Sequence, residues 1–258
     1  YHAPTAGLEC RGAFLYVHPF GDEMNKARRA VALQARAFAA MGFGVLQIDL
    51  FGCGDSSGEF ADARWERWKE DLAIAKKWLE AHVSAPLSLW GLRLGALLAL
   101  DFAAASKSAF DKIILWQPVV RGELFLTQFL RLRLAGEMLA EDAGKNSGTA
   151  AMRNALAAGE ILEVAGYAIA PDLAAAIDTL DAASLAVAKS AIHWMEIVPE
   201  AGRVMPPARA KVARVWEQAG SDLQVHMVAC APFWATQEVS ECPELLSATA
   251  AILATVQS

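Results

Sequence analysis

The 258-residue sequence has no excess of positive charge, because 29 Asp and Glu side chains outnumber 23 Lys and Arg and leave a net charge of −6. This balance argues against nucleic acid or an anionic membrane as a partner. The longest apolar run, residues 87–105, is interrupted by Arg93 and Asp101, whereas a membrane span needs about 20 residues almost free of charge. We therefore expect no nucleic-acid binding and no membrane span.

Cysteine is scarce, and the four residues Cys10, Cys53, Cys230 and Cys242 form neither a CxxC pair nor the Cys/His spacing of a metal site. We expect reduced thiols, no metal and a cytoplasmic location. Cys53 lies in a glycine-rich turn with no histidine near it in sequence, so it is not expected to be a nucleophile. Nucleotide-binding motifs are missing as well: "GLRLG" lacks the G-x-G-x-x-G spacing, and no Walker lysine follows "FGCGDSSG". No cofactor is predicted.

What the chain does have is an alternation of short apolar runs with helical patterns. Runs rich in β-branched and aromatic residues predict strands at residues 13–18, 45–49, 87–90, 113–116, 191–198 and 223–229. Apolar residues at helical spacing predict helices at residues 27–41, 62–82 and 95–105, and from about 244. This alternation indicates an α/β fold with a doubly wound, mostly parallel sheet.

Between residues 121 and 181 the pattern becomes alanine-rich and mostly helical, with a polar break at "EDAGKNSGTA" and an extended piece near residues 160–169. We predict a core formed by residues 1–120 and 182–258, and a helical cap formed by residues 121–181. Ligands of parallel sheets bind beyond the carboxyl ends of the strands. Four polar residues follow those ends: His18, Asp49, Arg93 and Gln117.

Four segments, in chain order, resemble the α/β-hydrolase superfamily. They are His18-Pro19-Phe20 after a strand, "DLFGCGDSSG" at 49–58, the turn from Gly91 to Gly95, and "IVPEAGRVMPPA" at 197–208. They resemble the oxyanion loop, a glycine-rich turn, the nucleophile elbow G-x-S-x-G and the loop that carries the catalytic acid. The resemblance implies an α/β-hydrolase-like fold with a helical cap and a hydrolase or esterase-like activity.

The chain departs from that family at both the nucleophile and the base. The elbow carries Arg93 instead of serine, and a guanidinium that stays protonated cannot attack an ester. The catalytic histidine of the family follows the last strand, but residues 232–238 contain none, and Trp234 and Gln237 lie there instead. His226 lies within the preceding strand and is expected to face away from the site.

Near the position of the acid, the sequence offers only Glu200, displaced from where the family carries it. Nucleophile and base act as a unit, and losing either costs about 10⁶ in rate in a well-studied serine protease. We therefore do not expect acyl transfer by the standard serine route.

Arg93 is nevertheless expected at a helix N-terminus, beside the N–H of Leu94 and opposite the N–H of Phe20. Two amides, a helix dipole and a guanidinium can bind a carboxylate or phosphate. The alternative is that Arg93 only forms a salt bridge with Glu23 and fills an inactive site. Glu23 itself is either a general base for water or merely the partner of Arg93, which would lower its pKa.

Three further side chains complete the predicted site. His18 either contacts a ligand and transfers protons or is a loop histidine that bonds to backbone. Trp234 either lines the site or packs in the core, and Gln117 is predicted to contact the ligand. The set of candidates is thus Arg93, Glu23 and His18 for chemistry, and Phe20, Leu94, Trp234 and Gln117 for binding.

Two segments, "HPFGDEMNKARR" and "APFWATQEVSECPELL", more narrowly resemble the type 2 hydrolase associated with bacterial exosortase and exopolysaccharide gene clusters. Two functions follow. The first is a hydrolase that works without a serine–histidine pair, using a water or an anionic substrate. The second is a non-catalytic protein that binds an anionic or acyl small molecule or a protein partner. The oligomeric state is left open.

Overall fold

The computed structural model describes residues 1–106, 108–139, 148–236 and 240–254. These divide into two compact units. The first unit contains Tyr1–Ile48, Leu72–Val119 and Ala182–Ser258, and the second contains Asp49–Asp71 and Val120–Asp181. The predicted cap, residues 121–181, falls in the second unit together with the segment that contains "DLFGCGDSSG".

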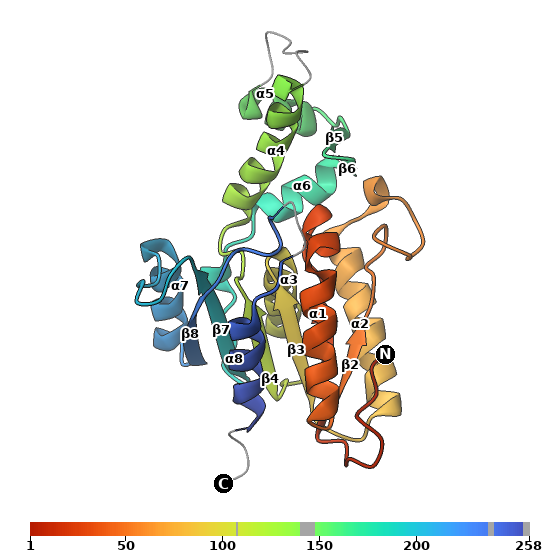
Figure 1. The fold of residues 1–258 in the computed structure, drawn as a ribbon. Coiled ribbons are helices and arrows are strands. Elements are labelled where there is room, and N and C mark those ends of the chain that lie inside the picture. Colours follow the sequence, from red (N-terminus) through yellow and green to blue (C-terminus); the bar gives the residue numbers. More distant parts are fainter. Residues whose placement is uncertain (107, 140–147, 237–239, 255–258) are drawn as a thin grey trace. The chain divides into compact units, whose positions relative to one another are not determined.

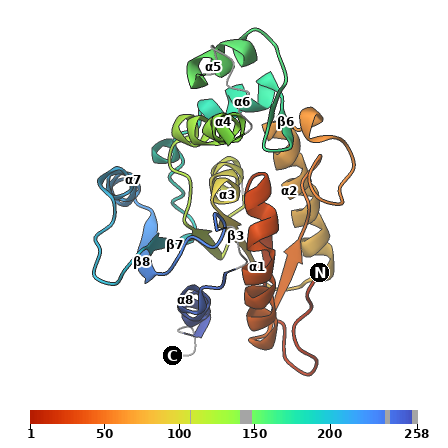
Figure 2. The same cartoon turned by 45° about the horizontal axis from the view of Figure 1, so that its top comes forward.

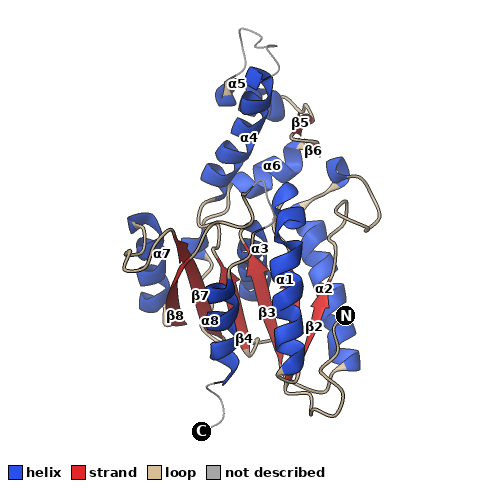
Figure 3. Ribbon diagram, viewed as in Figure 1, coloured by secondary structure: helices blue, strands red, loops and turns tan. Residues whose placement is uncertain are grey.

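The first unit is built on a six-stranded sheet in the order β2-β1-β3-β4-β7-β8, and every neighbouring pair is parallel (Figures 1 and 3). Its strands are β1 (Gly12–Val17), β2 (Phe43–Gln47), β3 (Leu87–Leu92), β4 (Lys112–Trp116), β7 (Ala191–Val198) and β8 (Asp222–Ala229). All six predicted strands are present at these places. The predicted fold class, a mostly parallel doubly wound sheet, is confirmed.

Helices cover both faces of this sheet, as Figures 1 and 2 show from two directions. On one face lie α1 (Asp22–Ala40) and α8 (Pro243–Ala254), and on the other lie α3 (Leu94–Ala105) and α7 (Pro207–Gln218). Another helix, α2 (Trp65–His82), begins in the second unit and continues in the first, and a short 3₁₀ turn, η2, spans Ala182–Ser184.

The core of the first unit is unusually aromatic. Four tryptophans are fully buried: Trp90, Trp116, Trp194 and Trp216. The ring of Trp90 lies 4.5 Å from that of Tyr16 and 4.8 Å from that of Trp116, centroid to centroid. Burying rings of this size gives a large hydrophobic gain and a rigid platform for the strand ends.

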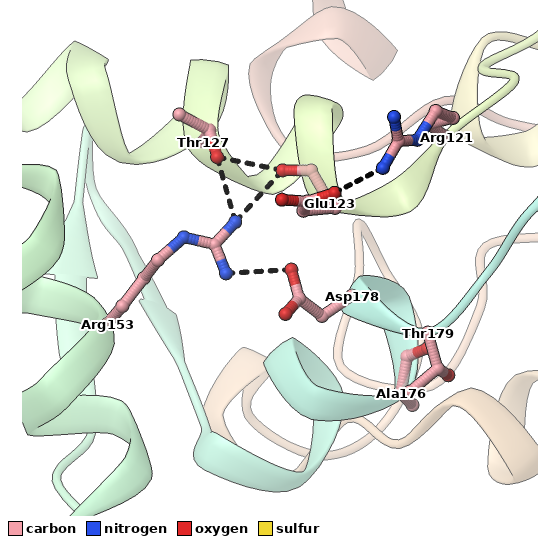
Figure 4. A network of polar contacts seen from close by, with 7 residues as sticks. All are labelled: Arg121, Glu123, Thr127, Arg153, Ala176, Asp178 and Thr179. Carbon is pink, nitrogen blue, oxygen red and sulfur yellow. Dashed lines mark hydrogen bonds and ion pairs between the residues drawn. The ribbon is translucent and has the colours of Figure 1, made fainter.

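The second unit is mostly helical, as predicted for residues 121–181. It contains η1 (Phe60–Asp62), α4 (Gly122–Leu139), α5 (Thr149–Ala157), the hairpin of β5 (Leu162–Val164) and β6 (Tyr167–Ile169), and α6 (Pro171–Asp178). One guanidinium joins three of these helices (Figure 4). Arg153 of α5 donates from Nη1 to Asp178 of α6 (2.8 Å), and from Nη2 to the Glu123 carbonyl (2.9 Å) and the Thr127 hydroxyl (2.8 Å) of α4.

The expectation of four reduced thiols is wrong for two of them. Cys230 and Cys242 form a disulfide, with Cα atoms 5.9 Å apart, whereas Cys10 and Cys53 are free. The spacing of 12 residues gave no sign of this pairing, because only the fold brings the end of β8 next to the start of α8. Disulfides are rare in reducing compartments, so the pair weighs against the reasoning behind a cytoplasmic location.

Among the described residues, no helix combines the length and the apolar character that crossing a membrane requires.

Candidate functional site

The turn between β3 and α3 keeps the backbone geometry of a nucleophile elbow. Arg93 has φ 57° and ψ −118°, a conformation that L-residues rarely adopt outside functional sites. Its N–H donates to the Trp116 carbonyl (3.0 Å), and its own carbonyl accepts from the N–H of Val119 (3.1 Å) and of Ala96 (3.2 Å). These bonds to β4 and α3 hold the turn in its strained conformation.

Two glycines flank the turn because no side chain fits there. A Cβ on Gly95 would lie 2.2 Å from the carbonyl oxygen of His18, and a Cβ on Gly91 would lie 2.5 Å from the Cα of Ala96. The start of α3 therefore touches the end of β1 directly. This contact brings the segment His18–Phe20 beside Arg93, as the resemblance implied.

The Arg93 side chain forms an ion pair with Glu23, at the start of α1. Its Nε lies 3.3 Å from Glu23 Oε1, and the two side chains are 14% and 22% exposed. An N-terminal helix position favours the carboxylate of Glu23. The N-terminus of α3 does not favour a cation, so Glu23 offsets an unfavourable position of Arg93. The predicted association of these two residues is present.

This ion pair leaves hydrogen-bonding capacity unused. Glu23 Oε2 is buried and has no hydrogen-bond partner among the described residues. On the Arg93 side, only Nε donates to a protein acceptor in the described part of the chain. A ligand could thus accept from the Nη groups of Arg93, whereas Glu23 Oε2 is an unsatisfied acceptor that is shielded from solvent.

The ionisation of Glu23 differs from the prediction. Arg93 and Lys26 do lower its pKa, but desolvation by burial is larger and leaves the pKa raised above its usual value. Arg93 lowers the pKa of Glu23 as predicted, but burial outweighs this effect. Glu23 also contributes to the raised pKa of Tyr16, after burial of that phenol.

The third side chain of the cluster is Trp234, which follows β8. Its ring lies 5.4 Å from the Arg93 guanidinium carbon, within the range of a cation–π contact, and is itself almost fully buried. Trp234 also packs edge-on against Phe233, at 5.1 Å between centroids. Trp234 therefore lies on Arg93, near where a hydrolase of this family carries its histidine.

His18, Phe20 and Leu94 are all buried near the elbow. The Nδ1 of His18 lies 2.8 Å from the Pro19 carbonyl, so Nδ1 carries the proton and donates to backbone. Of the two alternatives predicted for His18, this contact matches the one in which a loop histidine bonds to backbone. Leu94 is the first residue of α3, where N–H groups have no intrahelical partner, and its amide is thus placed to bind an anion.

Gln117 belongs to a second polar cluster, which the sequence analysis missed. Its Oε1 accepts from the Ile197 N–H (2.6 Å), and its Nε2 donates to Glu196 Oε1 (3.4 Å). Its own backbone has φ 43°, and its N–H donates to the Met195 carbonyl (2.9 Å). Both ends of the Gln117 amide are therefore used to join β4 to β7.

At the centre of this cluster is Glu196, which is only 1% exposed. Its Oε2 accepts from Trp194 Nε1 (2.9 Å) and from Arg209 Nη1 (3.2 Å), and Arg209 also donates to the Pro118 carbonyl (2.8 Å). Burial raises the pKa of Glu196 although Arg209 opposes this, and burial and Arg93 lower the pKa of Arg209. The sequence does contain a signal for this cluster, which is the single glutamate within the apolar strand "AIHWMEIV".

Among the described residues, Glu200 and His226 do not pair with each other. Glu200 is exposed and bonded to Arg203, with Nε to Oε1 at 2.7 Å. His226 faces His193 on the neighbouring strand, with 3.3 Å between its Nε2 and the Nδ1 of His193, so it is turned toward β7. Gln237 lies outside the described residues.

A reactive cysteine and a metal site are two other chemical possibilities. Burial, with Asp49 and Asp71 nearby, raises the pKa of Cys53 to about 12, so this thiol stays protonated and unreactive near neutral pH. No group of three His, Cys, Asp or Glu side chains that could hold a metal ion occurs in the part of the chain that the structure describes.

Comparison with known proteins agrees with this architecture. Residues 9–155, more than half of the chain, match the family described as serine aminopeptidase, S33. No curated protein matched the sequence.

Three solved structures illustrate the likeness in fold. Est1E from Butyrivibrio proteoclasticus with bound ferulic acid has a TM-score of 0.69 at 12% identity, over 97% of this chain and 90% of that one. A thermostable carboxyl esterase from Bacillus coagulans has a TM-score of 0.63 at 13% identity, over 98% and 92%. A soluble variant of monoglyceride lipase from Saccharomyces cerevisiae has a TM-score of 0.62 at 15% identity, over 98% and 89%. The chain therefore belongs to the serine aminopeptidase S33 family of α/β-hydrolases.

Proposed function

We propose that this protein is a non-catalytic member of its family that binds the carboxylate or acyl group of a small molecule at Arg93. The observation that carries the proposal is the state of the elbow. Its strained backbone is intact, but its side chain is a guanidinium held by Glu23 and covered by Trp234. A site of this kind can bind an anion, and its guanidinium cannot attack a carbonyl.

Binding of a carboxylate is supported by the donors that remain available. Arg93 presents Nη groups in a planar fork that suits two carboxylate oxygens, and the first amides of α3 lie beside it. The carboxylate of Glu23 already balances the charge of Arg93. A bound ligand carboxylate would therefore add one uncompensated negative charge to the site. We therefore favour a ligand that also carries an N–H or O–H donor, which would reach the buried Oε2 of Glu23 once that side chain turns toward the ligand.

A second candidate is a hydrolase in which Glu23 activates water. The raised pKa of Glu23 favours it, because a carboxylate is a better base as its pKa approaches the working pH. The ion pair with Arg93 disfavours it, because it occupies one oxygen of the base.

For the biological setting, we propose a role beside exosortase or exopolysaccharide systems in a bacterium. Its support is the resemblance of "HPFGDEMNKARR" and "APFWATQEVSECPELL", which include Glu23 and Trp234. A cytoplasmic location remains part of this proposal although the disulfide weighs against its reasoning, and fractionation of bacterial cells followed by detection of the protein in each fraction would test it.

The binding proposal can be tested by calorimetric titration with butyrate, octanoate and 3-hydroxyoctanoate, the last of which adds an O–H donor. Octanol is the neutral control ligand. We expect Arg93→Gln to weaken carboxylate binding at least about tenfold, and Arg93→Lys to restore it only in part, because lysine lacks the fork. Arg203→Gln, in an exposed ion pair, is the matched control and should leave binding unchanged. Equal affinity in the wild type and Arg93→Gln would contradict the proposal.

A further inference from the structure

The two edge strands of the six-stranded sheet, β2 and β8, differ in their backbone pairing. At one edge, β2 is covered by an antiparallel bridge: the N–H of His2 donates to the Val45 carbonyl (2.8 Å), and the N–H of Val45 donates to the His2 carbonyl (2.9 Å). At the other edge, β8 pairs with β7 alone among the described residues. Within the described parts of the chain, one edge is thus bridged by the chain itself and the other has no strand beside it.

The open strand also lacks the features that keep edge strands apart. Its sequence, DLQVHMVA, contains no proline, glycine or lysine, and after Asp222 it carries no formal charge. Val225 and Met227 lie on the same face of the strand and are 37% and 40% exposed. An uncharged, eight-residue, partly apolar edge is a template for pairing with another strand.

We propose that β8 pairs antiparallel with β8 of a second copy of this chain, around a two-fold axis that passes through Val225. A continuous sheet requires opposite residues to point to the same face, so that only registers centred on a residue are allowed. The proposed interface extends the sheet across both copies. It involves the first unit alone and is independent of the proposed function.

The strand complements itself in this register. Val225 lies opposite its own copy, and Leu223 lies opposite Met227 twice, which joins apolar side chains on one face. On the other face, Gln224 lies opposite His226 twice, which joins two groups that can hydrogen-bond. Shifting the centre to His226 would place two histidines opposite each other and Gln224 opposite Val228, which is a poorer match.

The charge at the end of the strand does not oppose the pairing. Asp222 falls opposite Val228, so the two Asp222 side chains lie about six residues, or roughly 20 Å, apart along the ribbon. This separation exceeds the Debye length of about 8 Å at physiological salt. A second copy therefore satisfies the open N–H and C=O groups without bringing like charges together.

Sedimentation velocity of the full chain, from about 1 to about 100 μM, tests the proposal over the range of a weak to moderate interface. We expect a concentration-dependent dimer. Val225→Lys should raise its dissociation constant at least about tenfold, because it places two ammonium groups at the axis. Val204→Lys, at an apolar residue that is 84% exposed outside the strand, is the matched control and should leave the dimer unchanged. A monomer at every concentration overturns the proposal, as does a dimer that Val225→Lys does not weaken.

A second variant tests the register without depending on a destabilising charge. Opposite residues in an antiparallel pair have Cα atoms about 4.5 to 5.5 Å apart, within reach of a disulfide. Val225→Cys should therefore form a cross-linked dimer under mild oxidation, and Val204→Cys should not. Absence of the Val225→Cys cross-link in a folded protein would overturn the two-fold axis at Val225.

Discussion

Two glutamate–arginine pairs lie at the carboxyl-end edge of the same sheet, and they are built in opposite ways. Glu196 is buried, and its oxygens accept from Arg209, Trp194 and Gln117. The pair of Glu23 and Arg93 is partly exposed, and one oxygen of Glu23 has no partner among the described residues. Protein groups satisfy both oxygens of Glu196, whereas one oxygen of Glu23 stays unsatisfied in the described part of the chain.

This difference in hydrogen bonding distinguishes a pair that holds the structure together from a pair that can bind a ligand. A buried ion pair is stable only when its remaining hydrogen bonds are satisfied, and the Glu196 cluster meets that condition while joining β4, β7 and α7. The Glu23–Arg93 pair sits on a strained elbow, and among the described residues the Nη groups of Arg93 and the buried Oε2 of Glu23 have no hydrogen-bond partner. We therefore assign the first pair to holding the strand ends together and the second to ligand binding.

The largest effect is expected from breaking the complete pair. Arg209→Ala leaves a buried carboxylate without its cation, which typically costs about 3 to 5 kcal/mol in the free energy of unfolding. Urea unfolding would measure it. Glu196→Gln keeps one acceptor oxygen and leaves no unpaired buried carboxylate, so it should cost less, although its NH2 group replaces an acceptor that faces a donor. A loss below about 1 kcal/mol for Arg209→Ala would show that the two pairs do not differ in the way described.

A smaller effect is expected at the elbow. Arg93→Ala removes an ion pair that water still reaches and releases a cation from a helix N-terminus, so we expect a loss of about 1 to 2 kcal/mol. The same unfolding measurement applies. If Arg93→Ala destabilised the protein more than Arg209→Ala, the elbow arginine would be the main structural element and the assignment of roles would be reversed.

The dependence of stability on pH should reveal Glu23. Burial raises its pKa above 4.5 in the folded protein, so the unfolded chain loses this proton first as the pH rises. The stabilisation that protonated Glu23 contributes is complete below the pKa of the unfolded chain. It is lost as the pH rises through the pKa of the folded protein. The wild type should therefore lose stability relative to Glu23→Gln from about pH 4.5 toward neutrality. Parallel profiles of the two proteins would show that the carboxyl is not perturbed.

The smallest effect is expected at Glu200 and Arg203, an exposed pair that serves as the reference for both others. Arg203→Ala should change the free energy of unfolding by less than about 1 kcal/mol, because solvent screens such pairs and ordering their side chains costs entropy. Chemical denaturation alongside the other variants provides this baseline.

Much of the fold was predictable because buried strands and amphipathic helices leave clear periodicities. "VLQID", "SLW" and "IILW" each mark a strand of the sheet, and the glycines at 91 and 95 mark a turn that only glycine permits. The meeting of Arg93 and Glu23 was also predictable, because both follow strand ends that reach the same edge of the sheet.

The rest depended on distances that a sequence does not contain. Glu196 was not predicted as a site residue, because its partner Arg209 lies thirteen residues later and only the fold brings the two side chains together. The sign of the Glu23 pKa shift required a comparison of two opposed effects, burial and the attraction of Arg93, of which burial is the larger. The disulfide of Cys230 and Cys242 required the positions of β8 and α8.

The most direct test of the central claim is hydrolysis of p-nitrophenyl butyrate and octanoate by the wild type and by Arg93→Ala, with Arg203→Ala as the matched control. The account predicts no turnover above background for any of the three proteins, because the elbow holds a cation in place of a nucleophile. Wild-type turnover that disappears in Arg93→Ala and persists in Arg203→Ala would contradict it and establish an arginine-dependent enzyme.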